Sequence, residues 1–335
     1  MGRIEKRVER KNVKRKRRLR TGFVVVLVLF LSIVVFGAYL ALQTYQAASD
    51  SYNDLDGREK SDLREEKVSI TDDPVSILLM GVEDYSSGGG NGRTDTLMVA
   101  TFNPSDKRLK LLSIPRDTLV EIAGKGTEDK ITHAHVFGGK EMTINTVESL
   151  LDIPIDYYAA VNFDAFKNIV DILGGITVDV PFSFQQNSDD RVAEKLQFYE
   201  GEMELDGRYA LAYARMRLED PRGDIGRNER QQQVITAIID KALSVGTVTK
   251  IDDLAKEVGS NVETNMKVSE GLSFLKEYSN FRTSNIDRLT LETHGQMING
   301  VSYQIYDEQS LAEVQDALKQ HLEIAAENTT TVKAE

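Results

Sequence analysis

The feature that most constrains this chain is an uninterrupted apolar segment close to its N-terminus. Residues 21–42, TGFVVVLVLFLSIVVFGAYLAL, contain no charged side chain and, as a helix, are long enough to cross a hydrocarbon core about 30 Å thick. Residues 1–20 carry eleven Lys or Arg and two Glu, and such a basic flank stays on the cytoplasmic side of a membrane. The pattern predicts a single-pass anchor with a cytoplasmic N-terminus and an exported C-terminal domain.

The N-terminal residues also have features of a cleaved signal peptide and of a nucleic-acid-binding arm. Small residues follow the apolar segment, which would suit a cleaved signal peptide, but the apolar part of such a peptide normally spans only about 7–15 residues. The basic run by itself would also suit a nucleic-acid-binding arm. Because membrane topology already explains the basic residues, no nucleic-acid partner is expected.

The rest of the chain is acidic and contains no cysteine. The net charge of the 335 residues is −12, so the 315 residues after the basic tail together carry −21. Without cysteine, thiol catalysis, thiolate metal sites and disulfides are excluded. An exported domain without disulfides must be stabilised by a hydrophobic core, and a chain of this length is long enough to form one. We expect a cell-membrane protein facing the outside of a Gram-positive bacterium.

Hydrophobic periodicity predicts one domain of alternating strands and helices. Residues 43–73 resemble a polar stalk, an ordered domain is expected over 74–325, and residues 326–335 are expected to be disordered. Strands are predicted at 75–82, 95–102, 109–114, 157–161, 176–180, 286–292 and 301–306. Helices are predicted at 138–152, 162–175, 226–246, 249–258, 268–280 and 307–325. The fold class is therefore α/β or α+β, with a central mixed sheet between helical layers.

Arginine and aspartate gather in three short stretches at the ends of apolar elements. These are GRTDT at 92–96, IPRDT at 114–118 and ARMRLEDPRGDIGR at 214–227. Taken singly, each arginine suits a surface ion pair, which contributes little to stability. Three such clusters on one scaffold favour a site. Its candidate arginines are Arg93, Arg116, Arg215, Arg217, Arg222 and Arg227.

Residue spacing indicates what these clusters would bind. In an extended segment, residues i and i+2 face the same side, so Arg93 and Asp95 project together. Several guanidinium groups suit an anion with many oxygens, whereas a carboxylate among them repels such an anion unless a divalent metal lies between. Mg²⁺ takes one or two carboxylates plus phosphate oxygens. Asp95 with Asp84 or Glu83 would hold Mg²⁺, or Mn²⁺ in its place, against a pyrophosphate.

Other chemical motifs find no support. GGG at 88–90 lacks the Lys-Ser/Thr of a phosphate-binding loop, and neither GxSxG nor HExxH is present. His133 and His135 have the spacing of two metal ligands, but no third histidine lies near them in sequence, which favours packing or surface roles.

Several longer motifs resemble those of the LytR-CpsA-Psr family. They are ILLMGV, GRTDTLMVATFNP, KLLSIPRDT, YYAAVNFDAF, DILGGITVDVP, LDGRYALAYARMR and GDIGRNERQQQVI, in this order over residues 74–245. The stretch GVEDYSSGGGNGRTDT is most similar to the wall-teichoic-acid branch of Bacillus-like bacteria.

The resemblance implies a membrane-anchored phosphotransferase. Members of the family move an anionic glycopolymer from a polyprenyl-pyrophosphate carrier to a sugar hydroxyl of peptidoglycan. By resemblance, Asp95 binds Mg²⁺, Asp224 supports the arginines or activates the acceptor, and Lys130 lies near the phosphates. The arginines that would hold the pyrophosphate are Arg93, Arg116, Arg215, Arg217 and Arg227.

Two points stay open within this interpretation. Many members carry Asp directly after the first strand, where this chain has Glu83 followed by Asp84, so the second metal ligand is either one. Attack by a hydroxyl needs a base, for which Asp224 and Asp117 are the candidates.

The carrier lipid needs an apolar slot, which helices at 139–151 and 163–173 over the sheet would form. Its predicted lining is Leu150, Phe163, Phe166, Ile169 and Val170. A hydrolase of polyprenyl pyrophosphate and a non-enzymatic envelope regulator remain as alternatives to the transferase.

Overall fold

The computed structural model describes the part of the chain that follows the predicted anchor. The described residues are 55, 58–83, 91–189, 195–243, 253, 254, 257, 261–267, 270, 271, 274 and 283–324. The predicted tail and anchor (1–42), Asp84 with the glycine loop, most of the two helices predicted within 249–280, and the C-terminal residues 326–335 lie outside them. Within the described residues, no helix is both long enough and apolar enough to span a bilayer.

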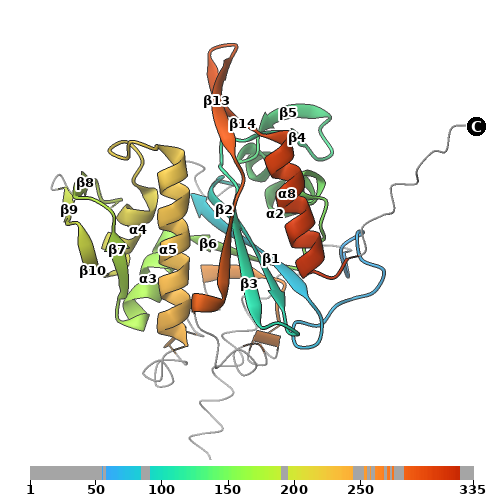
Figure 1. Ribbon diagram of the computed structural model, residues 1–335, viewed down its shortest axis with the longest axis horizontal. Helices are drawn as coiled ribbons and strands as arrows, with labels where there is room; N and C mark the ends of the chain where they lie inside the picture. Colours follow the sequence, from blue (N-terminus) through green and yellow to red (C-terminus); the bar gives the residue numbers. More distant parts are fainter. Residues whose placement is uncertain are drawn as a thin grey trace, which may run out of the picture. The chain divides into compact units, whose positions relative to one another are not determined.

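A six-stranded mixed sheet forms the centre of the domain (Figure 1). Its spatial order is β11 (Val262–Thr264), β6 (Tyr157–Asn162), β1 (Val75–Glu83), β2 (Arg93–Asn103), β3 (Arg108–Ser113) and β12 (Ile286–Thr290). β1 is antiparallel to β2 and parallel to β6, and β12 is parallel to β3. The predicted central mixed sheet with helices on its two sides is thus confirmed.

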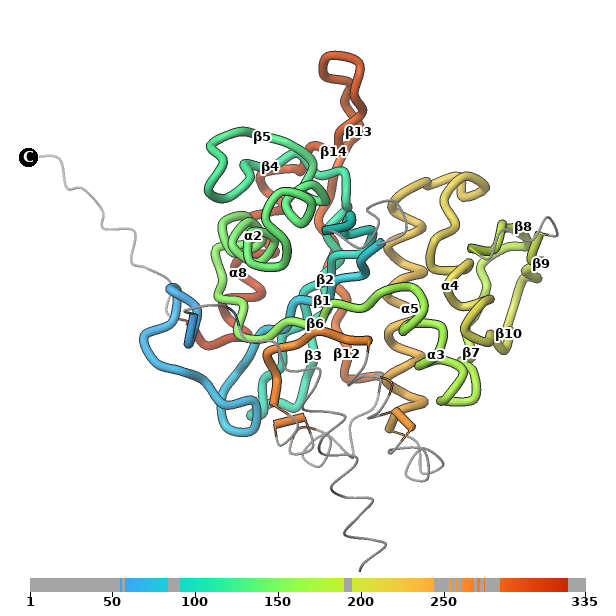
Figure 2. Tube along the Cα trace, turned by 180° about the vertical axis from the view of Figure 1, so that it is seen from behind, coloured from blue at the N-terminus to red at the C-terminus, as the bar shows by residue number. Residues whose placement is uncertain are grey.

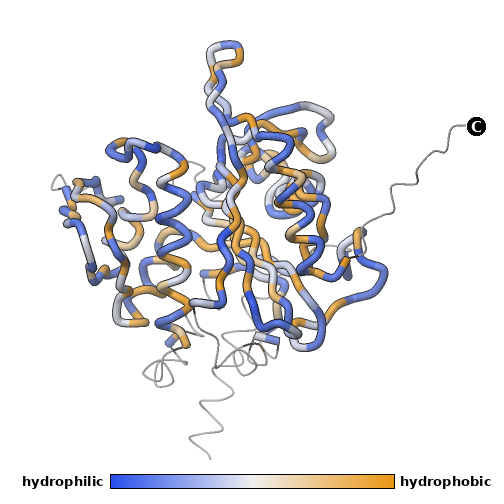
Figure 3. Tube along the Cα trace, viewed as in Figure 1, coloured by the Kyte–Doolittle hydropathy of each residue, from blue (hydrophilic) through white to orange (hydrophobic). Residues whose placement is uncertain are grey.

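Both faces of the sheet are covered, which explains why its strands are apolar at successive positions rather than at alternate ones. On one face, α2 (His133–Leu151) and α8 (Glu308–His321) pack on a core that includes Leu78 and Met80. On the other face, Ile77 belongs to a second core. Apolar colouring accordingly follows the central strands (Figure 3).

A third layer lies beyond the second face of the sheet. It contains α3 (Phe163–Leu173), α4 (Gly207–Arg215) and α5 (Asp224–Ala242), on the side of the sheet away from α2 and α8 (Figure 2). The strand pairs β7–β10 and β8–β9 close it on the outside and share with the helices a separate core. Their bounds are β7 Ile176–Val180, β8 Phe184–Gln186, β9 Leu196–Phe198 and β10 Gly201–Leu205.

The ends of α3 follow the predicted signals. The side chain of Asn162 caps its N-terminus by accepting a hydrogen bond from the Ala165 backbone N–H at 2.8 Å. Gly174, with φ of 85°, ends it in the left-handed conformation that glycine adopts without steric cost. α2 starts earlier than predicted, at His133, because the chain kinks at Gly138 and Gly139 rather than starting the helix there.

Two hairpins rise from one end of the sheet. They pair β4 (Leu119–Ile122) with β5 (Thr127–Lys130), and β13 (Thr293–Ile298) with β14 (Val301–Tyr306). A 3₁₀ turn at Thr283–Asn285 precedes β12. The β13–β14 hairpin projects away from the body of the domain (Figure 1), and its base is tied to the loop after β3 because Gln304 donates its backbone N–H to the Asp117 carbonyl at 2.9 Å.

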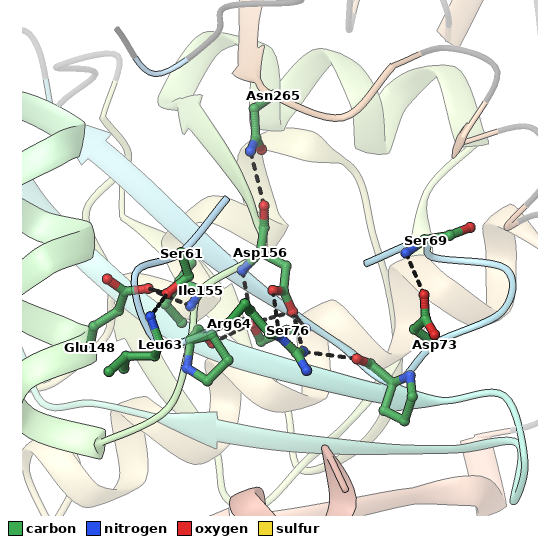
Figure 4. Close-up of polar contacts among 12 residues, drawn as sticks. Ser61, Leu63, Arg64, Ser69, Asp73, Ser76, Glu148, Ile155, Asp156 and Asn265 are labelled. Carbon is green, nitrogen blue, oxygen red and sulfur yellow. Dashed lines mark hydrogen bonds and ion pairs between the residues drawn. The ribbon is translucent and has the colours of Figure 1, made fainter. Parts of the chain in front are cut away.

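The segment before Pro74 belongs to the domain rather than to a free stalk. Arg64 donates to both carboxylate oxygens of Asp156, at 2.9 and 2.7 Å, and Arg58 reaches Glu148 at 2.5 Å. Figure 4 shows the contact of Arg64 with Asp156 beside the start of β1, and Ser61 beside Glu148. Ile70 is buried in the core under the sheet. The ordered domain therefore begins earlier than residue 74, which corrects the predicted boundary.

Candidate active site

A charged cavity of about 360 Å³ lies where β2, the loop after β3 and the N-terminus of α5 meet the β13–β14 hairpin. Its lining is Arg93, Arg116, Asp117, Lys130, Thr132, His133, Arg217, Asp224, Ser302 and Gln304. Six of these were predicted as site residues from the three clusters and the family resemblance. Sequence reasoning missed Thr132, Ser302 and Gln304, and it assigned His133 to packing or surface.

An apolar cavity of about 480 Å³ lies beside it, between the sheet and the third layer. β1 and β2 form its floor, and α3, α4 and α5 form its walls through mostly aliphatic and aromatic side chains. Phe163, Phe166 and Ile169 line it as predicted. Ile235 and Ile238 of α5 are only half-buried because they face this space.

Two predicted lining residues lie elsewhere. Leu150 of α2 is buried in the core on the opposite face of the sheet, so α2 does not contribute to the slot. Val170 is fully buried in the core of the third layer and faces away from the cavity. The helices predicted at 139–151 and 163–173 therefore do not share one slot; α4 and α5 take the place of α2.

Arg116 and Arg217 line both cavities, so the two spaces meet at these guanidinium groups. Nη1 of Arg116 donates to Oδ1 of Asp95 at 2.5 Å, and Asp95 itself lines the apolar cavity. Burial opposes the charge of Arg116, but the nearby carboxylates of Asp95, Asp117 and Asp224 outweigh it and raise the pKa of Arg116. A fixed positive charge thus sits at the junction.

Arg227 and Arg215 complete the positive rim on the side of the apolar cavity. Arg227 is 6% exposed, and burial lowers its pKa, although Asp224 opposes this through Oδ1 at 2.8 Å from Nη2. Arg215 ends α4 and lies over the Phe163 ring, 4.5 Å from its centroid. Met216 is extended and buried, so Arg215 and Arg217 project to the same side.

Several buried polar atoms around this junction neither donate a hydrogen bond to, nor accept one from, any residue that the structure describes. They are Oγ1 of Thr94, Nε of Arg116, Nε of Arg227 and Oδ1 of Asp224, the last of which is close to Arg227 but not in hydrogen-bonding geometry. A buried polar atom without a partner costs about 1–3 kcal/mol. Four of them in one place indicate that a polar ligand completes the site.

Lys130 and Asp117 form the far side of the charged cavity. Nζ of Lys130 lies 2.8 Å from Oδ1 of Asp117. Burial raises the pKa of Asp117, but Lys130 and Arg116 more than compensate, so that its pKa lies below the ordinary value. Asp117 is therefore an anion that holds Lys130 in place.

Two other predicted residues lie outside both cavities. Arg222 is exposed and pairs with Glu229 at 2.8 Å on the outer side of α5, which corrects its predicted role in substrate binding. Glu83 lies opposite Arg93 in the β1–β2 pair and lines neither cavity. Asp84, the other candidate metal ligand, is outside the described residues.

The histidines do not form a metal site. His133 faces the charged cavity, whereas His135 is buried and its Nδ1 lies 2.8 Å from the Gly92 carbonyl oxygen. Across the described ranges, no group of three or more His, Asp or Glu is placed to hold a metal ion.

Comparison with known proteins places this geometry in a family. The model of the LytR_cpsA_psr family matches residues 38–320, which is most of the chain. The protein is a member of this family. The family model thus matches residues on both sides of 74–245, the range that contains the motifs.

Two named relatives extend this family comparison. The polyisoprenyl-teichoic acid–peptidoglycan teichoic acid transferase TagV of Bacillus subtilis (strain 168) is 44% identical over 305 residues, covering 90% of this chain and 78% of TagV. The crystal structure of B. subtilis TagV has a TM-score of 0.68 and covers 76% of this chain and 99% of that one, at 45% identity. A structure of the family protein TagT (YwtF) with bound octaprenyl pyrophosphate lipid has a TM-score of 0.64 at 31% identity, covering 82% of this chain and all of that one.

The loop from Arg217 to the start of α5 at Asp224 is held by a buried ion pair that sequence reasoning missed. Arg230 is 1% exposed; it pairs with Asp220 and donates through Nη2 to the Met216 carbonyl at 2.5 Å. Gly226 lets the Asp220 carboxylate approach, because a Cβ at this position would lie 1.8 Å from its Oδ2. This pair fixes the start of α5.

We expect Asp220→Asn to lower the free energy of unfolding by about 3–5 kcal/mol at pH 7, because it leaves the Arg230 charge buried without a counter-ion. Burial raises the pKa of Asp220, but Arg230 and the Arg222 backbone N–H bring it below 3.8. A lowered pKa means that the stabilisation is full above pH 3.8 and is lost as the pH falls through the folded value.

Urea unfolding at pH 7 and at low pH measures this difference. The matched control is Asp287→Asn, which breaks a partly exposed pair with Arg108 and is expected to cost at most about 1 kcal/mol. Equal midpoints for Asp220→Asn and the unmodified protein at pH 7 would contradict the assignment.

Proposed function

We propose that this protein transfers an anionic glycopolymer, of the wall-teichoic-acid type, from a polyprenyl-pyrophosphate carrier to a sugar hydroxyl of peptidoglycan. The observation that carries the proposal is the meeting of an apolar cavity and a charged cavity at Arg116 and Arg217. An amphiphile with a long apolar chain and an anionic head fits such a pair of spaces. The names of TagV and of the lipid-bound TagT structure support this substrate class.

The chemistry follows from the charges at the junction. The polyprenyl chain occupies the apolar cavity, and the pyrophosphate lies between Arg116, Arg217 and Arg227. The acceptor hydroxyl attacks the polymer-side phosphorus from the charged cavity, and polyprenyl phosphate leaves. Phosphoryl transfer depends mainly on positioning and on neutralising charge at the phosphate oxygens, which these guanidinium groups supply.

Asp95 would bind Mg²⁺, or Mn²⁺ in its place, and the ion would bind the pyrophosphate together with the arginines. Mg²⁺ takes one or two carboxylates and completes its shell with phosphate oxygens and water, so a site with few protein ligands suits it. Asp95 would hold the ion, with Glu83 or Asp84 as the second ligand. When bound, the ion would supply further positive charge at the phosphates.

Asp95→Asn is therefore expected to raise the Mg²⁺ concentration needed for half-maximal transfer by at least about 10-fold, since it removes a charged ligand. A titration of the transfer rate with Mg²⁺ after removal of metal by a chelator measures the change, with Asp287→Asn as the control. Undiminished transfer in the presence of excess chelator would contradict the role of the metal.

The predicted anchor fits this substrate. Residues 21–42 would span the cell membrane once, with residues 1–20 in the cytoplasm and the domain outside. The domain would then stay where its lipid-linked substrate resides, and the wall would present the acceptor.

Product analysis tests the proposed function. The protein is incubated with a lipid-linked glycopolymer with and without peptidoglycan fragments, and the products are identified by mass spectrometry. Polymer linked through phosphate to peptidoglycan is expected, together with an equal amount of polyprenyl phosphate. Release of free polymer at the same rate without peptidoglycan would instead identify a hydrolase, and no reaction with either would favour a regulator.

A further inference from the structure

Asp129 and His133 form a carboxylate–imidazole pair at the wall of the charged cavity. His133 is the first residue of α2 and lines the cavity together with Asp117, Lys130 and Asp224. Its Nδ1 lies 2.8 Å from Oδ2 of Asp129 at the end of β5. The proposed chemistry above leaves this pair without a role.

The contact with Asp129 fixes which ring nitrogen can accept a proton. Burial raises the pKa of Asp129, but the hydrogen bonds from His133 and the Lys130 backbone N–H outweigh it, so the pKa lies below its ordinary value. As an anion, Asp129 accepts, and Nδ1 of the imidazole donates. A neutral ring then has its lone pair on Nε2, to which none of the described residues is hydrogen-bonded. Phe137, one turn further along α2, meets the ring edge-on at 6.0 Å between centroids.

The other two candidates for the base each lie beside a cation. Asp117 is paired with Lys130 at 2.8 Å, and its pKa is lowered. Oδ1 of Asp224 lies 2.8 Å from Arg227. The lowered pKa makes Asp117 a weak proton acceptor, and Asp224 lies against the cation Arg227, whereas an imidazole oriented by a carboxylate is a common general base.

We propose that His133, oriented by Asp129, removes the proton from the acceptor hydroxyl; this rests on the proposed function. The hydroxyl oxygen forms a bond to the polymer-side phosphorus as its proton passes to Nε2. The bond from this phosphorus to the bridging oxygen breaks, and polyprenyl phosphate leaves with the electron pair. His133 then returns its proton to solvent. His133 is a catalytic residue in this account, and Asp129 is a positioning residue.

The first test compares His133→Gln with the unmodified full-length protein in the transfer assay. We expect kcat to fall by about 10²–10⁴-fold, the usual contribution of general base catalysis, while the amount of polyprenyl pyrophosphate retained by the protein stays the same. Asp129→Asn is expected to lose part of this rate. His294→Gln is the matched control, because His294 is exposed on β13 and lines neither cavity.

The second test separates a proton acceptor from a structural residue. The transfer rate of the unmodified protein should fall as the pH becomes acidic, because a protonated imidazole cannot accept the hydroxyl proton, and this dependence should be absent from His133→Gln. Free imidazole should restore transfer to His133→Gly. The charged side chains that line the cavity with His133 are Arg93, Arg116, Asp117, Lys130, Arg217 and Asp224, and none of them is an imidazole.

The outcomes distinguish failure of the inference from failure of the proposed function. An unchanged kcat in His133→Gln, or a retained low-pH fall in that variant, overturns the inference and leaves the proposed function standing. Failure of imidazole to restore His133→Gly also overturns it. If the unmodified protein transfers nothing to any peptidoglycan acceptor, the proposed function and this inference are both overturned.

Discussion

Arg116→Ala is expected to reduce the rate of glycopolymer transfer by about 10³-fold or more, because an arginine that neutralises a transferring phosphoryl group is worth about 10³–10⁵ in rate. Arg116 is the residue best placed for this role. It lines both cavities, carries a raised pKa, and has an Nε that no described residue hydrogen-bonds. The transfer assay with saturating lipid substrate measures the loss.

Two further variants show whether transfer depends on the planar guanidinium group of Arg116 or only on its positive charge. Arg116→Lys keeps the charge but loses the planar set of donors, so we expect most of the rate to be lost here as well. Arg222→Ala is the matched control: Arg222 lies in the same cluster of the sequence but pairs with Glu229 at the surface, and its removal should change the rate less than about 2-fold, as for other surface pairs. Equal losses at Arg116 and Arg222 would show that the arginines act through net charge alone.

Ala214→Trp is expected to abolish retention of the polyprenyl lipid. Ala214 lines the apolar cavity from α4, together with Phe166 of α3 and Ile238 of α5. An indole at this position would fill space that the lipid chain needs, and each buried CH₂ group contributes about 0.8 kcal/mol to binding. Exclusion of a single isoprene unit therefore costs several kcal/mol. Mass spectrometry of lipid extracted from the purified protein measures retention.

Ala312→Trp is the control for this change. Ala312 is exposed on α8, on the other side of the sheet, so the same substitution there should leave lipid retention unchanged. Full retention in Ala214→Trp would show that the lipid lies elsewhere. Loss in both variants would point to a general effect of the substitution on folding.

The sequence predicted the charged half of the site because its residues lie at the ends of strands and helices. Arg93 and Asp95 start β2, Arg116 follows β3, and Arg217 follows α4. Segments of this kind leave the core at one edge of the sheet, so clusters far apart in sequence come together there. Arg116 and Arg227 were found in this way.

The sequence did not predict the lipid slot correctly, because apolar helix residues look alike whether they face a core or a cavity. Leu150 and Phe166 both belong to apolar helices, but α2 packs on one face of the sheet and α3 on the other. Only the three-dimensional path of the chain shows which helix packs on which face of the sheet. The arginines around the start of α5 pose the same problem. Arg222, just before the helix, is exposed and pairs with Glu229, whereas Arg230, within the helix, is buried against Asp220, and only the fold places these partners.

β14 was predicted at its observed bounds, 301–306, but β13 and the turn that joins the two strands were missed although the sequence contains the signal. Asn299 and Gly300 join the two strands with positive φ values of 52° and 81°, and Asn-Gly is the strongest short signal for such a turn. Recognising it would have predicted β13 and brought Ser302 and Gln304 into consideration as cavity residues.

A cocrystal structure with a polyprenyl pyrophosphate tests the central claim most directly. The account predicts the polyprenyl chain among Phe163, Phe166 and Ile238, and phosphate oxygens within hydrogen-bonding distance of Arg116 and Arg227. A pyrophosphate bound away from the junction, with the Nε atoms of these two arginines still without partners, would contradict it.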